Sequence, residues 1–305
     1  MDPREEMEAL RQASGKKLKW ELLISLAISV TLALLLRQYA LILLGPILCM
    51  IVFAILGKGK DTARYRELYK QAYVRKILEE QFPGVVYLPE SGIPQWTVAE
   101  TGMMDTGDRF HSEDYVSGYY KDVHFEQSDV RIEVEEKEID DKGNTSTKYV
   151  CVFGGRWLIF AFNKSFRAEL IVVSKDFPNL KKMERLRRKS NRLHEIRTES
   201  EAFHERFLVY AEDDHTAFYL LTPSMMERIL RLDATGLGTL LFSFRDNRLH
   251  VAVHGVKNAF EPPAGMGRID EAAVRSQILA EIDPITQLVE DLRLDNDLFK
   301  QDQFQ

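Results

Sequence analysis

Cysteine is scarce in this chain, which holds only Cys49 and Cys151 among its 305 residues. The first lies in an apolar run and the second in a predicted strand, so we do not expect them to pair. A secreted disulfide scaffold is therefore excluded, and a reducing cytoplasmic compartment is favoured.

Positive charge is in short supply after residue 60. Residues 61–305 carry 33 basic and 42 acidic side chains, a net charge of −9, whereas residues 1–60 carry a net charge of +3. An acidic folded region argues against nucleic acid as the main partner.

Motifs that state a reaction are missing as well. The sequence contains neither the dinucleotide-binding fingerprint nor the nucleoside-triphosphate loop, and it has no nucleophile elbow. No histidine–cysteine arrangement has a recognisable spacing. The sequence therefore assigns no catalytic residue, cofactor or metal ion, and an enzyme is less favoured than a binding protein.

Charge is absent from two apolar stretches, Leu22–Leu36 and Ala40–Leu56, which are separated by residues 37–39. A bilayer core of about 30 Å requires roughly 17–25 helical residues. We therefore predict a transmembrane helical hairpin with spans 20–36 and 40–56. An exposed turn cannot lie in lipid, so the linker is expected at the far interface.

Basic residues on both flanks predict the orientation of this hairpin, because positively charged loops stay in the cytoplasm. We expect a cell inner-membrane protein with both termini in the cytoplasm. A cleaved signal peptide, one long helix and a buried soluble hairpin are less favoured alternatives. The flanking residues are Lys16, Lys17, Lys19, Lys58, Lys60, Arg64 and Arg66.

Beyond the hairpin, alternating patterns separated by turn residues predict an α+β domain with a mainly antiparallel sheet. The stretch 85–115 reads as largely irregular. Pro83-Gly84 is expected to end the first helix, and Thr222 to cap a later one. The predicted helices are 61–82, 93–101, 222–232 and 270–294, and the predicted strands are 119–138, 147–162, 169–174, 207–211, 216–221, 239–244 and 248–254.

These elements divide the chain into five predicted parts. They are a cytoplasmic N-terminal segment (1–19), the transmembrane hairpin (20–56), a basic juxtamembrane helix (57–82), the α+β domain (83–268), and a C-terminal helix and tail (269–305).

Three segments in this order resemble a known family. They are DRFHSEDYVSGYYKDVHF (Asp108–Phe125), VFGGRWLIFAFNKSF (Val152–Phe166) and FLVYAEDDHTAFYLLTPSMMERIL (Phe207–Leu230). The pattern resembles the bacterial membrane-protein family catalogued as domain of unknown function 3137, over most of residues 60–262. The resemblance implies architecture and location, and no chemistry.

Several motifs could be read as functional sites, but a structural role explains each of them better. Phe153-Gly154-Gly155 lacks a following helix, so a bulge or a close backbone crossing is favoured over a phosphate loop. His250 and His254 share a strand face about 13 Å apart, too far for one metal ion.

Two acidic clusters are read as turns. His111-Ser112-Glu113-Asp114 has a polar-turn composition, and Glu212-Asp213-Asp214-His215 is expected as a hairpin turn between two strands. Neither cluster contains a recognisable nucleophile paired with a base.

The basic stretch Lys181–Arg197 is the strongest remaining candidate for function. Each Lys or Arg near an anionic leaflet contributes about 1 kcal/mol to membrane binding. We therefore predict a membrane-anchored binding or scaffold module that engages anionic lipid headgroups or a membrane-protein partner; a membrane-bound hydrolase is the alternative. The predicted lipid- or partner-binding residues are Lys58, Lys60, Arg64, Arg66, Lys181, Lys182, Arg185, Arg187, Arg188 and Lys189.

Overall fold

The architecture is that of a computed structural model of the 305-residue chain. The described residues are 2–36, 60–102, 104–139, 145–161, 168–180, 183–184, 192–255, 260–263 and 269–294. The expected second span, the turn at 141–144 and most of the basic stretch 181–197 lie outside this description.

The chain forms two compact units. The first comprises Met1–Ile77 and Phe260–Ser276, and the second comprises Leu78–Ala259 and Gln277–Gln305. Both units are therefore built from segments that are distant in the sequence.

Helices make up the first unit. Within it, α1 and α3 pack together, and Arg64 of α3 joins Glu6 of α1 with 2.7 Å between Nη2 and the carboxylate. Arg4 forms a second ion pair with Glu271 at 3.1 Å. The helical segments are α1 (Pro3–Leu36), α3 (Lys60–Tyr69), a π-helical stretch (Lys70–Val74) and α4 (Arg75–Gln81), which continues into the second unit.

The predicted helix 61–82 is confirmed, and it ends before Gly84, whose φ of 81° continues no helix. No described helix is both long and apolar enough to span a membrane.

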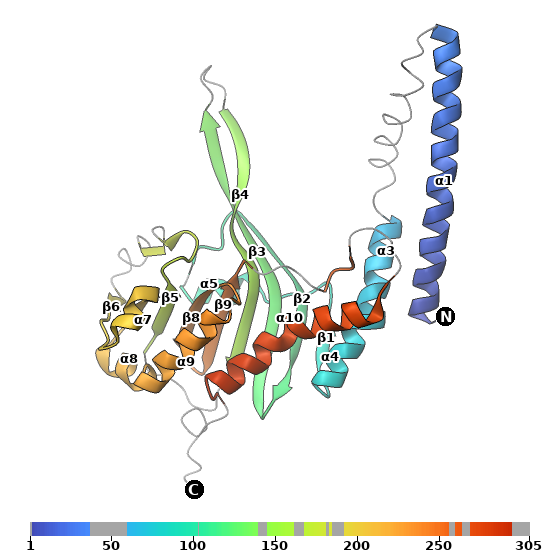
Figure 1. Ribbon diagram of the computed structural model, residues 1–305. Coiled ribbons are helices and arrows are strands. Elements are labelled where there is room, and N and C mark those ends of the chain that lie inside the picture. Colours follow the sequence, from blue (N-terminus) through green and yellow to red (C-terminus); the bar gives the residue numbers. More distant parts are fainter. Residues whose placement is uncertain are drawn as a thin grey trace. The chain divides into compact units, whose positions relative to one another are not determined.

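A nine-stranded antiparallel sheet forms the second unit, which confirms the predicted α+β class (Figure 1). Its strand order is β1-β2-β3-β4-β9-β8-β5-β7-β6. The strands are β1 (Val86–Leu88), β2 (Arg109–Tyr120), β3 (Val123–Ile139), β4 (Thr145–Ala161), β5 (Leu170–Ser174), β6 (His194–Glu195), β7 (Phe207–Ala211), β8 (Thr239–Arg245) and β9 (Arg248–His254).

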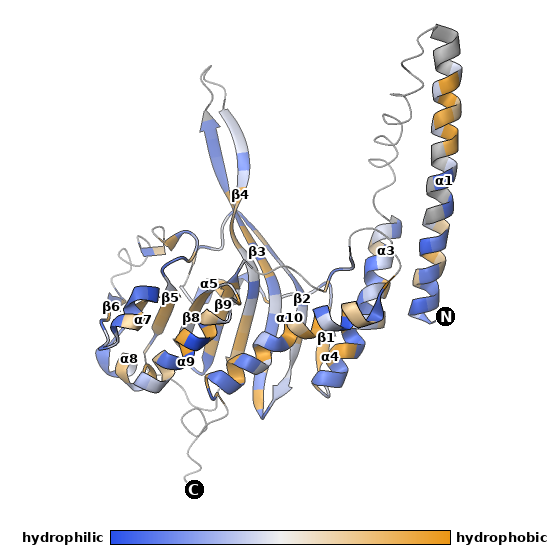
Figure 2. Ribbon diagram, in the orientation of Figure 1, coloured by the Kyte–Doolittle hydropathy of each residue, from blue (hydrophilic) through white to orange (hydrophobic). Residues whose placement is uncertain are grey.

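Part of the sheet is built from hairpins between consecutive strands, whereas β4 pairs with β9 and β5 pairs with β8 across long connections. The register Ile139↔Thr145 confirms the expected pairing of β3 with β4, and Arg245↔Arg248 closes the predicted β8–β9 hairpin. Consecutive apolar residues of the central strands are buried, so apolar side chains lie on both faces there. Figure 2 shows hydrophobic colouring along these strands.

Helices cover the sheet on both sides. One face carries Trp157 and Ile159 and packs against Ile93 and Val98, which anchor α5 (Gln95–Glu100). The opposite face carries Arg156, which bonds to α10. The remaining helices are α7 (Glu201–Arg206), α8 (Asp214–Leu220), α9 (Pro223–Ala234) and α10 (Glu271–Asp291).

One predicted strand is wrong. Residues 216–221 belong to helix α8, because Asp213 caps its first turn by accepting from the Thr216 backbone N–H at 2.7 Å. The capping bond and the buried face of Ala217 and Leu220 outweigh the strand propensity of the aromatic residues. The cap of α9 by Thr222, in contrast, is confirmed at 3.2 Å.

Candidate functional site

A polar cavity lies where the β8–β9 turn meets α5, all within the second unit. Its volume is about 460 Å³, within the usual range of ligand sites. We call it the turn cavity. Its lining residues are Trp96, Thr97, Glu100 and Thr101 from α5 and its C-terminal end, and Arg245, Asp246, Asn247, Arg248 and His250 from the hairpin.

The hairpin places two arginines directly opposite each other. Arg245 and Arg248 are register partners across a two-residue turn in which Asp246 adopts φ 50°. Like charges at directly opposed positions destabilise a strand pair. The hairpin therefore concentrates positive charge at the cavity at some cost to its own stability.

The two guanidiniums have different surroundings. Arg245 donates to the backbone carbonyl of Glu100, and its Nε lies 3.6 Å from an Asp246 carboxylate oxygen. Arg248 is exposed and makes no hydrogen bond or ion pair within the described part of the chain. Arg245 is thus held in place, whereas Arg248 keeps its donors free.

His250 lies at the inner wall of the cavity and is buried. Its Nδ1 accepts a hydrogen bond from Trp157 Nε1 at 3.3 Å. Burial, reinforced by the charges of Arg248 and Arg245, lowers the pKa of His250 to about 3. The ring is therefore neutral at physiological pH and carries its proton on Nε2, a donor and a very weak base.

Helix α5 supplies the opposite wall. Trp96 keeps 60% of its surface exposed, although Val98 two residues later is fully buried. The carboxylate of Glu100 has no partner among the described residues. This wall thus offers an aromatic face and a free negative charge.

Arg156, on the other face of the sheet, forms a contrasting cluster. It is 2% exposed, pairs with the Glu281 carboxylate, and donates from Nη1 to the Glu281 carbonyl at 2.6 Å. Asp129, its register partner, lies 3.8 Å from Nε. Burial lowers the pKa of Arg156 to about 10, which leaves it charged at neutral pH.

The glycines beside it follow the structural interpretation. A register shift places a bulge near Phe153, and a Cβ on Gly155 would meet the Val253 carbonyl oxygen at 2.0 Å. The predicted bulge and close backbone crossing are both confirmed. No phosphate loop is formed, since β4 continues through these residues.

His250 and His254 share one face of β9, as expected from their spacing. His254 accepts from the Gly154 backbone N–H at 3.2 Å, and burial lowers its pKa. Each histidine thus has its own partner.

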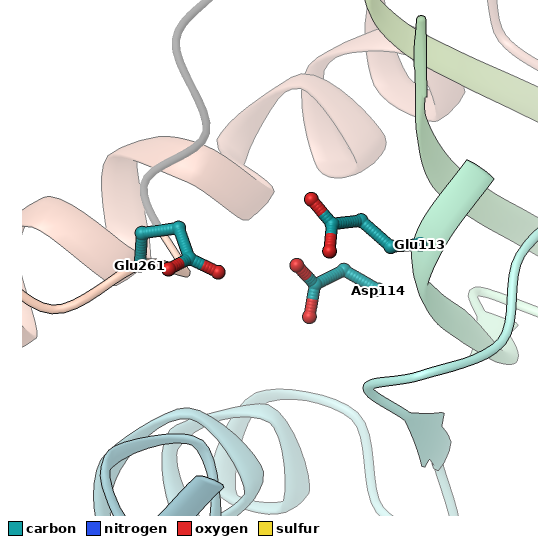
Figure 3. A group of neighbouring side chains, drawn as sticks. All are labelled: Glu113, Asp114 and Glu261. Atoms are coloured by element: carbon teal, nitrogen blue, oxygen red, sulfur yellow. The ribbon is translucent and has the colours of Figure 1, made fainter. Parts of the chain in front are cut away.

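The expected turn at residues 111–114 is wrong, because these residues lie within β2. The strand absorbs them through an irregularity between Glu113 and Val116, where Asp114 adopts φ 58°. The Tyr87 hydroxyl donates to the Asp114 carboxylate at 2.6 Å. This hydrogen bond compensates for the burial of the Asp114 side chain. Figure 3 shows Glu113 and Asp114 leaving this strand; Glu261, also labelled there, belongs to the first unit.

The second acidic cluster is not a hairpin turn. Besides the cap by Asp213, Asp214 bonds to His194 at 2.7 Å, and Glu212 pairs with Arg192 at 3.0 Å. These carboxylates stabilise a strand-to-helix junction.

Of the predicted lipid-binding residues, only Arg64 and Arg66 have described side chains. Arg64 pairs with Glu6 and Glu67, and Arg66 pairs with Glu261 at 2.6 Å; both remain nearly half exposed. Lys60 begins α3, and the other seven residues lie outside the description. Their contact with lipid stays a prediction.

The turn cavity was not found from the sequence. The available signal was a pair of arginines flanking a two-residue turn, Arg245 and Arg248. These arginines meet Trp96 only because α5 packs against the sheet, and no local sequence pattern predicts that packing.

The fold and the cavity define an α+β protein with a large antiparallel sheet and a polar site at one hairpin turn. The family model described as "Protein of unknown function (DUF3137)" matches residues 151–294, so this segment is similar to that family. The resemblance seen in the sequence is thus confirmed.

Comparison with solved structures gives a distant match. The crystal structure of the mycobacterial trehalose monomycolate transport factor A, TtfA, is similar with 12% identity and a TM-score of 0.37. The match covers 72% of this chain and 93% of that one. No curated protein matches the sequence.

Proposed function

We propose that this protein is a membrane-anchored cytoplasmic module that binds a small polar group in the turn cavity without transforming it. The proposal rests on the composition of the cavity wall. It combines the free guanidinium of Arg248, the exposed ring of Trp96 and the neutral imidazole of His250. These groups recognise ligands by charge, stacking and hydrogen bonding.

The same wall does not favour the hydrolase alternative. A general base works best with a pKa near the operating pH, and His250 lies far below it. The Thr101 hydroxyl donates to the Val98 carbonyl at 2.6 Å, and a backbone carbonyl does not activate a hydroxyl as a nucleophile.

The proposed anchor is the hairpin of spans 20–36 and 40–56. Helix α1 supports it, because six large apolar side chains between residues 20 and 30 are exposed, and exposed apolar patches of this kind mark interaction surfaces. These side chains are Trp20, Leu23, Ile24, Leu26, Ile28 and Val30. The flanking lysines favour a cytoplasmic location for both termini.

A labelling experiment tests the anchor and its orientation. Cys151 is free and exposed and serves as a native reporter of the folded region, whereas Gln38→Cys reports on the linker. Intact spheroplasts treated with a membrane-impermeant maleimide should label the introduced Cys at position 38 and leave Cys151 unlabelled until lysis. Labelling of Cys151 in intact cells contradicts the cytoplasmic assignment.

Site-specific photocrosslinking tests binding in the cavity. A benzophenone amino acid replaces Trp96 in the full-length protein in its membrane, with the exposed Tyr119 as matched control outside the cavity lining. We expect a discrete adduct from position 96 alone. Equal adducts from both positions, or none from position 96, contradict a binding site there.

A further inference from the structure

The turn cavity carries two uncompensated charges of opposite sign. Neither Arg248 nor the Glu100 carboxylate forms an ion pair, and they do not pair with each other within the described chain. They belong to different elements, Arg248 to β9 and Glu100 to the C-terminal end of α5, which meet where Arg245 donates to the Glu100 backbone carbonyl. We call the part of the lining with Arg245 and Arg248 the positive side of the cavity, and the part with Trp96 and the Glu100 carboxylate the negative side.

The positive side suits a phosphate group. Arg245 and Arg248 oppose each other on one face of the hairpin, and guanidinium forks bind phosphate through paired hydrogen bonds. A bound anion would relieve the repulsion between two like charges in direct register. His250 is neutral and adds an N–H donor at the same wall.

The negative side suits an ammonium group. An exposed indole attracts cations over its face, and ligands with quaternary ammonium groups are recognised in this way. Trp96 presents such a face one helical turn before the free carboxylate of Glu100. Together, the ring and the carboxylate offer a cation two favourable contacts.

We propose that the turn cavity binds a zwitterionic phosphate ester, with the phosphate at Arg245 and Arg248 and the ammonium at Trp96 and Glu100. Phosphoethanolamine and phosphocholine have this chemistry, whether as soluble esters or as phospholipid headgroups. The inference rests on the proposed binding function and names the class of its ligand.

Other ligand classes would complement only one of the two charged sides of the cavity. Inorganic phosphate would leave Glu100 without a counter-charge and would be repelled by it. A nucleotide can stack on Trp96 but brings no cation to the carboxylate. A ligand with both charges complements both sides.

Isothermal titration calorimetry on the full-length protein in neutral detergent tests this assignment. The probes are phosphoethanolamine, inorganic phosphate and ethanolamine. We expect phosphoethanolamine to bind at least about tenfold more tightly than either of the other two, since it alone makes charge-assisted contacts through both of its charged groups.

Variants assign each half of the ligand. Arg248→Gln should weaken phosphoethanolamine binding roughly tenfold or more, and Glu100→Gln should abolish the preference for it over inorganic phosphate. Matched controls are Arg131→Gln and Glu138→Gln, whose side chains are 59% and 64% exposed outside the cavity lining. Both controls should bind as the wild type does.

Nanodiscs distinguish the two sources. If the ligand is a lipid headgroup, phosphatidylethanolamine nanodiscs should compete with soluble phosphoethanolamine and phosphatidylglycerol nanodiscs should not. If it is a soluble ester, neither nanodisc competes and the calorimetric preference remains; both results support the zwitterion.

Equal affinity for inorganic phosphate, insensitive to Glu100→Gln, overturns the assignment, as does failure of every phosphate probe to bind. In those cases, the photocrosslinked adduct from position 96 would still be expected. Failure of the ligand class is thus distinguishable from failure of the proposed function.

Discussion

Arg156 and Arg248 lie on neighbouring strands of the same sheet but have opposite surroundings. Arg156 is 2% exposed under α10 and is held by Glu281 and Asp129. Arg248 is exposed at the rim of the turn cavity and has no partner in the described chain. The same side chain is therefore held by buried ion pairs at one position and available to a ligand at the other.

These opposite surroundings indicate where a ligand can bind in this fold. A buried ion pair adds little net stability, yet removing one partner is costly because the other charge remains without compensation. An exposed arginine contributes little to stability in either direction. The Arg156 cluster is therefore structural, and the turn cavity is the better candidate for recognition.

The largest expected effect comes from removing the buried arginine. Arg156→Met should lower the free energy of unfolding by about 3–5 kcal/mol, because the Glu281 and Asp129 carboxylates would remain without their cation. Urea unfolding of the full-length protein in detergent, followed by tryptophan fluorescence, measures this loss.

The exposed Arg197→Met serves as control and should leave the urea midpoint unchanged. Adding Glu281→Gln to Arg156→Met should restore part of the stability. A loss below about 1 kcal/mol in the single variant would contradict the structural role of the cluster.

A substitution at Gly155, one residue before Arg156, tests the close approach of β4 to the backbone of Val253 on β9. Gly155→Ala should cost about 1–3 kcal/mol, because its Cβ would meet the backbone of Val253 at 2.0 Å and only a backbone shift could make room. Gly154→Ala is the matched control, since its Cβ meets only the Cys151 sulfur at 3.3 Å. Equal losses in both variants would show that strand flexibility, and not the close crossing, decides the cost.

Acid should weaken the fold through His250. Its pKa lies near 3 in the folded protein and near 6.5 in the unfolded chain, so between these values the unfolded chain binds more protons. The free energy of unfolding therefore falls as the pH is lowered, by about 2 kcal/mol from about pH 7.5 to about pH 5. Urea titrations at both pH values measure the loss.

His250→Gln removes this titration and keeps a side-chain acceptor for Trp157. The variant should lose about 2 kcal/mol less than the wild type over the same pH interval. An identical pH dependence in the two proteins would show that His250 is not the group responsible.

The sheet was largely predictable from the sequence because alternation and turn residues are local signals. The β8–β9 hairpin, the β3–β4 pairing and the cap of α9 by Thr222 all follow from such signals. Residues 109–115 were missed as a strand because the irregularity at Glu113 and the φ of 58° at Asp114 interrupt the alternation.

The turn cavity was beyond prediction because its walls come from distant segments. Trp96 and Arg248 are brought together only when α5 packs on the sheet through Ile93 and Val98. The Arg156 cluster is similar, since Glu281 lies 125 residues away in the sequence. Charge composition alone could not tell the structural arginine from the available one.

The smallest expected effect is on the stability of the Arg248→Gln variant. It directly tests the difference between the exposed Arg248 and the buried Arg156. Its free energy of unfolding should stay within about 0.5 kcal/mol of the wild type, because an exposed side chain without partners is removed. Any change should be a gain, since Arg245 loses a like-charged neighbour in direct register. Urea unfolding measures this term under the conditions used for Arg156→Met. A loss above about 1 kcal/mol would mean that Arg248 supports the fold as Arg156 does, and any weakening of phosphoethanolamine binding in this variant could then reflect damage to the hairpin.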